Sequence, residues 1–313
     1  MRPKNLISGN AARVPGPLQP DREDVLLGLS PSGFHKIAYV DWGPLDDPRP
    51  VICLHGLTRQ GRDFDYLAAE LAAKGRRVIC PDLPGRGRSG WLREPDHYSL
   101  PQYCADMNAL IARLGIQEVD WVGTSLGGLV GMVMAGFSGG VVRKLVINDI
   151  GPYVTSTGLQ RIGQYIGNMP SSFSTLEEGE TYFRKVLAPY GYLSDAHWRH
   201  LTVHSLRSDA ERRQHAVLCD PAIAKGFKLP WYYPALDLWK YWEAISVPIL
   251  VLRGASSDLL SRALMLEMRK RNRQAEVFQF DNCGHVPPLM APDQINIVTT
   301  FLESGSGLKH DQS

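Results

Sequence analysis

Residues 119–128 read Val-Asp-Trp-Val-Gly-Thr-Ser-Leu-Gly-Gly and constrain the fold more than any other stretch of the chain. The first residues are typical of a short buried strand, and the apolar run that follows is typical of a helix. A strand that turns directly into a helix needs one apex residue in a strained conformation, usually with φ > 0 and an exposed side chain. Gly123 and Gly127 carry no side chains that would collide around such an apex. The sequence therefore predicts that Ser125 is an exposed nucleophile.

A serine hydroxyl must lose its proton to a base as it attacks, so the chain has to supply a histidine. His285 ends a loop that follows a strand-like run at 276–280. An acid is also needed to orient the imidazole. Asp258 ends the loop Gly-Ala-Ser-Ser-Asp, which follows the apolar run 247–253. We expect Ser125, Asp258 and His285 to form a catalytic triad.

With these motifs the chain resembles α/β-hydrolase-fold serine hydrolases that carry a cap, over about residues 25–305. The resemblance also rests on His55-Gly56-Leu57 after a strand and on the Pro-Asp-Leu-Pro-Gly-Arg-Gly-Arg-Ser loop at 81–89. It implies that the backbone N–H groups of Leu57 and Leu126 form the oxyanion hole. It also implies that His55 is structural and fixes the oxyanion loop by bonding to the backbone.

The resemblance leaves two possible positions for the acid of the triad. Most of the family place it after the seventh strand, where this chain has Asp258, and some relatives place it after the sixth, where this chain has Asp149. We expect Asp258 to be the acid. Asp149 is expected to end its strand or to bond to the loop at Gly151.

Strand-like and helix-like segments alternate through the first half of the chain, which indicates a mostly parallel sheet with helices on both faces. With an antiparallel entry hairpin at 25–41, we expect a twisted sheet of about eight strands, the α/β-hydrolase fold. The alternation stops at 153–245, a segment with helical periodicity that is too long to be a loop. We predict a helical cap there, inserted after strand six. The expected division is a tail at 1–20, a core at 21–152 and 246–305, the cap at 153–245, and a tail at 306–313.

The predicted cap is rich in aromatic residues, most of which are expected to pack it against the core. A minority should line an apolar substrate pocket, since ligand sites are largely apolar clefts between domains. Arg161 is the first candidate for binding a substrate carboxylate, although a surface salt bridge is the commoner role for such a residue. The aromatics are Tyr165, Phe173, Tyr182, Phe183, Tyr190, Tyr192, Trp198, Trp231, Tyr232, Tyr233, Trp239, Tyr241 and Trp242.

Composition excludes several classes of protein. The 34 basic and 32 acidic residues of the 313 nearly balance, so neither nucleic acid nor an anionic membrane is indicated as a partner. The longest apolar run is too short to span a bilayer, and residues 1–20, which contain no apolar h-region, are not expected to be a secretory signal. Five cysteines, some in apolar strand-like runs, fit a reduced compartment, so a soluble cytoplasmic protein is expected.

No metal or organic cofactor is expected. His197, His200 and His204 could lie along one helical face, where zinc is conceivable. Because no cysteine or carboxylate completes a ligand set nearby in the sequence, an ordinary solvated helix face is the preferred interpretation.

These residues favour a carboxylesterase that cleaves small to medium acyl esters through an acyl-enzyme. A hydrolase of carbon–carbon bonds in dienoic ring-cleavage products and a lactonase have the same triad and stay open. A ligand receptor without turnover is the alternative from another class. The only partner expected is a small-molecule ester, and the sequence leaves open whether the chain is a monomer or a dimer.

Overall fold

The structure is a computed structural model that describes residues 18–137, 140–227 and 235–304. Most of the predicted N-terminal tail and all of the C-terminal tail at 306–313 lie outside these ranges. Three of the aromatic residues predicted for the cap, Trp231, Tyr232 and Tyr233, lie outside them as well.

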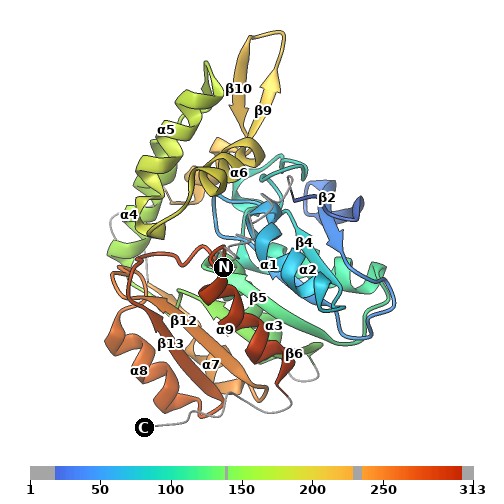
Figure 1. Ribbon diagram of the computed structural model, residues 1–313, viewed down its shortest axis with the longest axis vertical. Helices are drawn as coiled ribbons and strands as arrows, with labels where there is room; N and C mark the ends of the chain where they lie inside the picture. The colour runs from blue at the N-terminus through green and yellow to red at the C-terminus, as the bar shows by residue number, and fades with distance from the viewer. Residues whose placement is uncertain (1–17, 138–139, 228–234, 305–313) are drawn as a thin grey trace, which may run out of the picture.

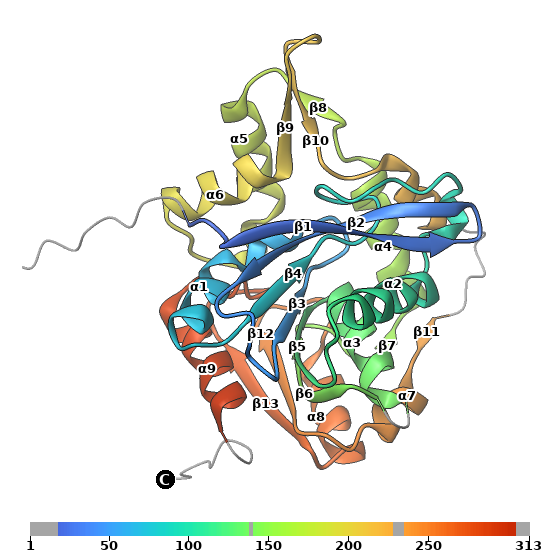
Figure 2. The same cartoon turned by 90° about the vertical axis from the view of Figure 1, so that its right-hand side faces the viewer.

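An eight-stranded sheet with the order β1-β2-β4-β3-β5-β6-β12-β13 forms the centre of the molecule (Figures 1 and 2). The hairpin β1–β2 is antiparallel and joins β4 in antiparallel fashion, and every pair from β4 to β13 is parallel. This confirms the predicted α/β-hydrolase fold. The strands are β1 (Arg22–Ser30), β2 (Gly33–Trp42), β3 (Val51–Leu54), β4 (Val78–Pro81), β5 (Val119–Thr124), β6 (Val142–Asn148), β12 (Ile249–Gly254) and β13 (Ala275–Phe280).

Helices cover both faces of this sheet because successive strand side chains point to opposite sides. In β5, Trp121 contributes to the core beneath α2, α3 and α8, whereas its neighbour Val122 contributes to the core beneath α1 and α9. Both side chains are fully buried. The helices are α1 (Asp65–Ala73), α2 (Leu100–Arg113), α3 (Leu126–Gly136), α8 (Arg262–Arg271) and α9 (Pro292–Glu303).

The segment between β6 and β12 is helical as expected, but it also contains short strands. A three-stranded sheet, β8-β10-β9, lies beside α5 and α6, and its β9–β10 hairpin projects at the top of Figure 1. A second small sheet pairs β11 with β7. The elements are β7 (Tyr153–Val154), α4 (Ser156–Gly167), β8 (Ser172–Phe173), α5 (Leu176–Val186), η3 (Ala188–Tyr190), α6 (Asp195–Ser205), β9 (Leu206–Asp209), β10 (Gln214–Val217), η4 (Pro221–Phe227), β11 (Leu236–Asp237) and α7 (Trp239–Ala244).

The end of this segment packs differently from its beginning. Phe183, Trp198 and Leu201 belong to a separate apolar cluster that is formed mostly by the insertion. Trp242 of α7 is instead fully buried in the core beneath α3 and α8, and its Nε1–H donates to the Met268 carbonyl at 3.0 Å. Thus α7, which the sequence assigned to the cap, packs among the helices of the sheet.

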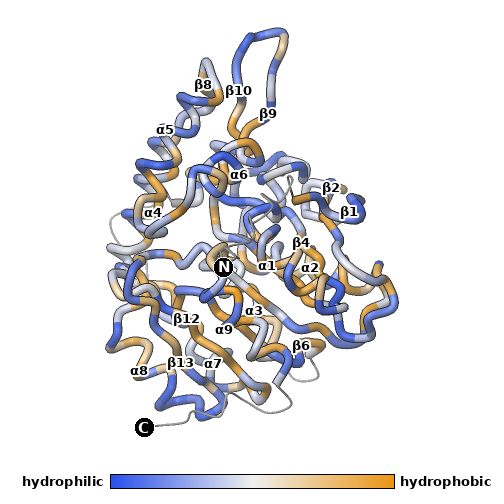
Figure 3. Tube along the Cα trace, in the orientation of Figure 1, coloured by the Kyte–Doolittle hydropathy of each residue, from blue (hydrophilic) through white to orange (hydrophobic). Residues whose placement is uncertain are grey.

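Hydropathy along the chain follows this arrangement. Apolar stretches lie along the central strands, whereas the tip of the β9–β10 hairpin is hydrophilic (Figure 3). In the described part of the chain, every helix is too short or too polar to cross a membrane.

Candidate active site

Ser125 stands at the apex between β5 and α3, with φ 49° and ψ −110°. This is the strained conformation that the motif requires. Its N–H donates to the Asn148 carbonyl at 2.9 Å, which ties the apex to the end of β6. The flanking glycines are required sterically: a Cβ on Gly127 would lie 1.9 Å from the Leu54 carbonyl oxygen, and one on Gly123 would lie 2.2 Å from the Gly127 oxygen. The backbone therefore holds Ser125 in one place.

His285, in the loop after β13, pairs with Asp149. Its Nδ1 lies 2.8 Å from Asp149 Oδ2, and the Asp149 side chain is fully buried. With Nδ1–H donating to the carboxylate, Nε2 becomes the nitrogen that can accept a proton. Two further donors hold the carboxylate: the Gly254 N–H at 2.9 Å from Oδ1 and the Ser257 hydroxyl at 2.6 Å from Oδ2. The imidazole is thus oriented by a carboxylate that is itself fixed.

Asp258 was predicted to pair with His285, and the structure does not show this contact. The Asp258 side chain is 55% exposed and forms an ion pair with Arg161, Nη2 to Oδ2 at 3.0 Å. The reason lies in the loop after β12, which directs Ser257 toward the buried carboxylate while Asp258, one residue on, stays half exposed. Asp149 has φ 60° and lies directly after β6, a backbone turn that the sequence pattern did not indicate.

The loop after β3 is anchored by two buried side chains. His55 Nδ1 lies 2.7 Å from the Gly56 carbonyl, and its Nε2 accepts from the Leu83 N–H at 2.9 Å. Burial lowers the pKa of His55 to about 3, so the ring is neutral, as this pairing requires. Arg86, which is fully buried, donates from Nε to the Leu57 carbonyl at 2.7 Å. His55 thus bonds the backbone as expected, whereas the Arg86 contact could not be predicted from the sequence pattern.

Leu57 and Leu126, whose N–H groups are expected to form the oxyanion hole, lie in the loop after β3 and at the start of α3. Leu126 is the first residue of α3, and N–H groups in the first turn of a helix have no acceptor within the helix. Leu57 lines the same cavity as Ser125 and His285, in the loop fixed by Arg86. The positive end of the α3 dipole adds to the attraction for a developing negative charge.

Ser125 and His285 line one cavity of about 340 Å³ between the sheet and the insertion. This volume lies in the range typical of small-molecule sites. Its wall is mostly apolar, and the insertion contributes Ile162, Tyr165, Leu187 and Tyr190. Two of the aromatic residues predicted for the cap therefore line the cavity, whereas others pack inside the insertion, and Tyr192 is 90% exposed.

Two guanidinium groups also reach this cavity, and both have carboxylate partners. Arg59 forms a two-point pair with Asp63, with both contacts at 2.7 Å. Arg161 is 52% exposed and forms the ion pair with Asp258. Arg161 is thus the more accessible of the two cations for a ligand.

Comparisons with known proteins agree with the fold. The profile of the alpha/beta hydrolase family matches residues 51–296. The chain is 42% identical over 279 residues to the 3-hydroxybutyrate-oligomer hydrolase of Cupriavidus necator, covering 87% of this chain and 94% of that protein. It is 31% identical to Esterase Rv0045c of Mycobacterium tuberculosis over 85% of this chain and 83% of that protein. The crystal structure of an alpha/beta hydrolase from Novosphingobium aromaticivorans superposes with a TM-score of 0.78 at 32% identity, covering 90% of this chain and 98% of that one.

Proposed function

Because the chain belongs to the alpha/beta hydrolase family, we propose that it is a serine esterase in which Ser125, His285 and Asp149 form the catalytic triad. The observation that carries the proposal is the 2.8 Å contact between His285 Nδ1 and Asp149 Oδ2. It is supported by the strained backbone of Ser125 and by the cavity that Ser125 shares with His285. The acid in this proposal is Asp149 in place of Asp258.

The reaction would proceed by acyl transfer. Ser125 Oγ attacks the ester carbonyl while His285 Nε2 takes its proton, and the imidazolium then protonates the leaving alcohol. Asp149 stabilises the imidazolium through Nδ1. The N–H groups of Leu57 and Leu126 bind the tetrahedral oxyanion, and each would contribute about 3 to 4 kcal/mol at the transition state. Water, activated by His285, then releases the acid from Ser125.

For the substrate we favour short oligomers of 3-hydroxybutyrate. The support is the identity of 42% with the C. necator hydrolase, which extends over 87% of this chain. Such an oligomer has small acyl units, ester bonds and one terminal carboxylate. The mostly apolar cavity suits the acyl units, and Arg161 at its wall suits the carboxylate, which would displace Asp258 from the guanidinium.

The test uses the purified full chain and its Ser125→Ala variant. Release of 3-hydroxybutyrate from the dimer and trimer is followed by chromatography, alongside a p-nitrophenyl ester series from acetate to palmitate. We expect turnover of the oligomers and of the short p-nitrophenyl esters. Replacing Ser125 should remove about 10⁴-fold or more of the activity, since loss of a triad nucleophile has cost up to about 10⁶-fold elsewhere.

Each alternative predicts another outcome. Turnover of dienoate substrates with inert esters would indicate a carbon–carbon bond hydrolase, and preference for cyclic esters would indicate a lactonase. Tight, ligand-dependent stabilisation without turnover would indicate a receptor. Equal rates for the wild type and Ser125→Ala would contradict the proposed mechanism.

A further inference from the structure

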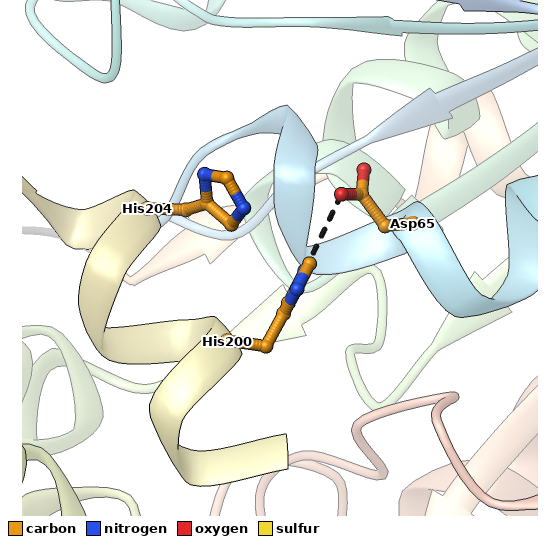
Figure 4. A group of neighbouring side chains, drawn as sticks. All are labelled: Asp65, His200 and His204. Carbon is orange, nitrogen blue, oxygen red and sulfur yellow. Dashed lines mark ion pairs between the residues drawn. The ribbon is translucent and has the colours of Figure 1, made fainter. Parts of the chain in front are cut away.

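The histidines of α6 do not form the solvated helix face that the sequence favoured. His200 and His204, one turn apart on α6, face Asp65, the first residue of α1 (Figure 4). The Asp65 side chain is fully buried and that of His200 is only 10% exposed. The third histidine, His197, contributes to the cap of its own helix through Ser194. An element of the insertion and an element of the core thus bring together two imidazoles and a carboxylate.

The spacing of these three groups is close to that of a metal site. Asp65 Oδ2 lies 3.4 Å from His200 Nε2, and one ligand atom from each residue falls within 4.8 Å of the others. Tetrahedral zinc with bonds near 2.0 to 2.1 Å places its ligand atoms about 3.3 Å apart. The Asp65–His200 separation already fits that value.

One oxygen of this cluster, Asp65 Oδ1, has unused bonding capacity. Arg62 donates from Nε and Nη2 to Asp65 Oδ2, both at 2.7 Å, but the buried Oδ1 has no hydrogen-bond partner. A neutral imidazole offers one lone pair to a metal ion, which is the role proposed below for His200 and His204. A metal ion would satisfy the buried Asp65 oxygen that Arg62 leaves without a partner.

We propose that Asp65, His200 and His204 bind one divalent transition-metal ion, with Zn²⁺ as the ion that fits their chemistry. Two imidazole nitrogens and one carboxylate oxygen form a ligand set typical of zinc, with water as the fourth ligand. Binding through His200 Nε2 exchanges its 2.9 Å contact with the Arg62 carbonyl for a metal bond. The ion would join α6 of the insertion to α1 of the core. None of the three residues lines the catalytic cavity, so the ion would act on stability and take no part in hydrolysis.

The test is titration of Zn²⁺ into the chelator-treated full chain by calorimetry, with thermal unfolding measured in parallel. The variants are His200→Gln and His204→Gln. The matched control is His215→Gln, because His215 lies in β10 of the same insertion and outside the cluster. We expect one Zn²⁺ per wild-type chain and per control chain, and affinity at least tenfold weaker in both cluster variants. Zinc at 100 times its Kd should raise the wild-type Tm by about 5 °C.

X-ray absorption of the zinc-loaded wild type gives a test that does not depend on the folding of a variant. It should show only nitrogen and oxygen ligands near 2.0 to 2.1 Å, whereas binding by one of the five cysteines would add sulfur near 2.3 Å. Sulfur ligands would overturn the proposal. So would the absence of zinc binding by the wild type, or cluster variants that bind zinc as tightly as His215→Gln.

Discussion

His285 Nδ1 lies 2.8 Å from Asp149 Oδ2, and this contact joins the loop after β13 to the residue that directly follows β6. The loop after β12 supports the pair, because the Gly254 N–H and the Ser257 hydroxyl both donate to Asp149. The strands β6, β12 and β13 are adjacent and parallel, so their carboxyl ends meet at one edge of the sheet. Under the mechanism proposed above, β6 provides the acid, and the loop after β12 positions it.

Replacing Arg161 should affect acidic substrates selectively. In Arg161→Gln we expect KM for 3-hydroxybutyrate oligomers to rise about tenfold, because a charge-assisted hydrogen bond to a carboxylate contributes about 1.5 to 3 kcal/mol. The KM for neutral p-nitrophenyl butyrate should stay within about twofold. Arg199→Gln is the control, since Arg199 is an exposed arginine of α6 that pairs with Glu177 outside the cavity. Steady-state kinetics with both substrates measures these changes in KM. An equal change in KM for the acidic and the neutral substrate would show that Arg161 does not bind the carboxylate.

Substituting Gly127 should destabilise the turn between β5 and α3. In Gly127→Ala the new Cβ would meet the Leu54 carbonyl oxygen at 1.9 Å, a backbone atom that cannot move without disturbing β3. We expect the free energy of unfolding to fall by about 3 kcal/mol or more, as for overpacking and strain in a core. Gly167→Ala at the end of α4 has open space around its Cβ and should be neutral or up to about 1 kcal/mol more stable. Urea unfolding of both variants measures the difference, and equal stability would contradict the steric account.

The buried His55 should make the protein less stable in mild acid. Its pKa falls from 6.5 to about 3 on folding, so below pH 6.5 the unfolded chain binds a proton that the folded chain does not. The free energy of unfolding therefore loses up to about 1.4 kcal/mol per pH unit from this residue as the pH falls from about 6 to 4. His55→Gln should be less stable at pH 7 but should lose less stability on acidification. Urea unfolding at several pH values measures both slopes, and identical slopes would exclude His55 as the cause.

The nucleophile and the base could be predicted from sequence because their signals are local. Ser125 is marked by the glycines two residues on either side, and His285 by the strand that precedes its loop. The acid could not be decided in this way. Asp149 and Asp258 both follow buried strands, and the outcome depends on the φ of 60° at Asp149 and on Ser257, one residue before Asp258, donating to that carboxylate. The pattern of apolar and polar residues does not show which of two neighbouring loop residues faces the site.

Contacts between segments far apart in the chain could not be predicted from the sequence either. Asp65 lies far from His200 along the chain, so the carboxylate that faces the α6 histidines was not visible beside them. The sheet of the insertion was missed because β8, β9 and β10 have only two to four residues each, too few for an alternating pattern. The helix α7 is as rich in aromatic residues as the rest of the predicted cap. Its sequence therefore did not show that Trp242 packs in the main core.

The most direct test of the proposed triad compares kcat/KM for p-nitrophenyl butyrate in Asp149→Asn and Asp258→Asn. An asparagine in place of the acid keeps the shape of the site but favours the wrong imidazole tautomer, which has cost about 10⁴-fold in kcat in a serine protease. We predict a loss of about 10⁴-fold for Asp149→Asn and a change within about threefold for Asp258→Asn. The reverse order, with Asp258→Asn inactive and Asp149→Asn active, would contradict the assignment of Asp149 as the acid.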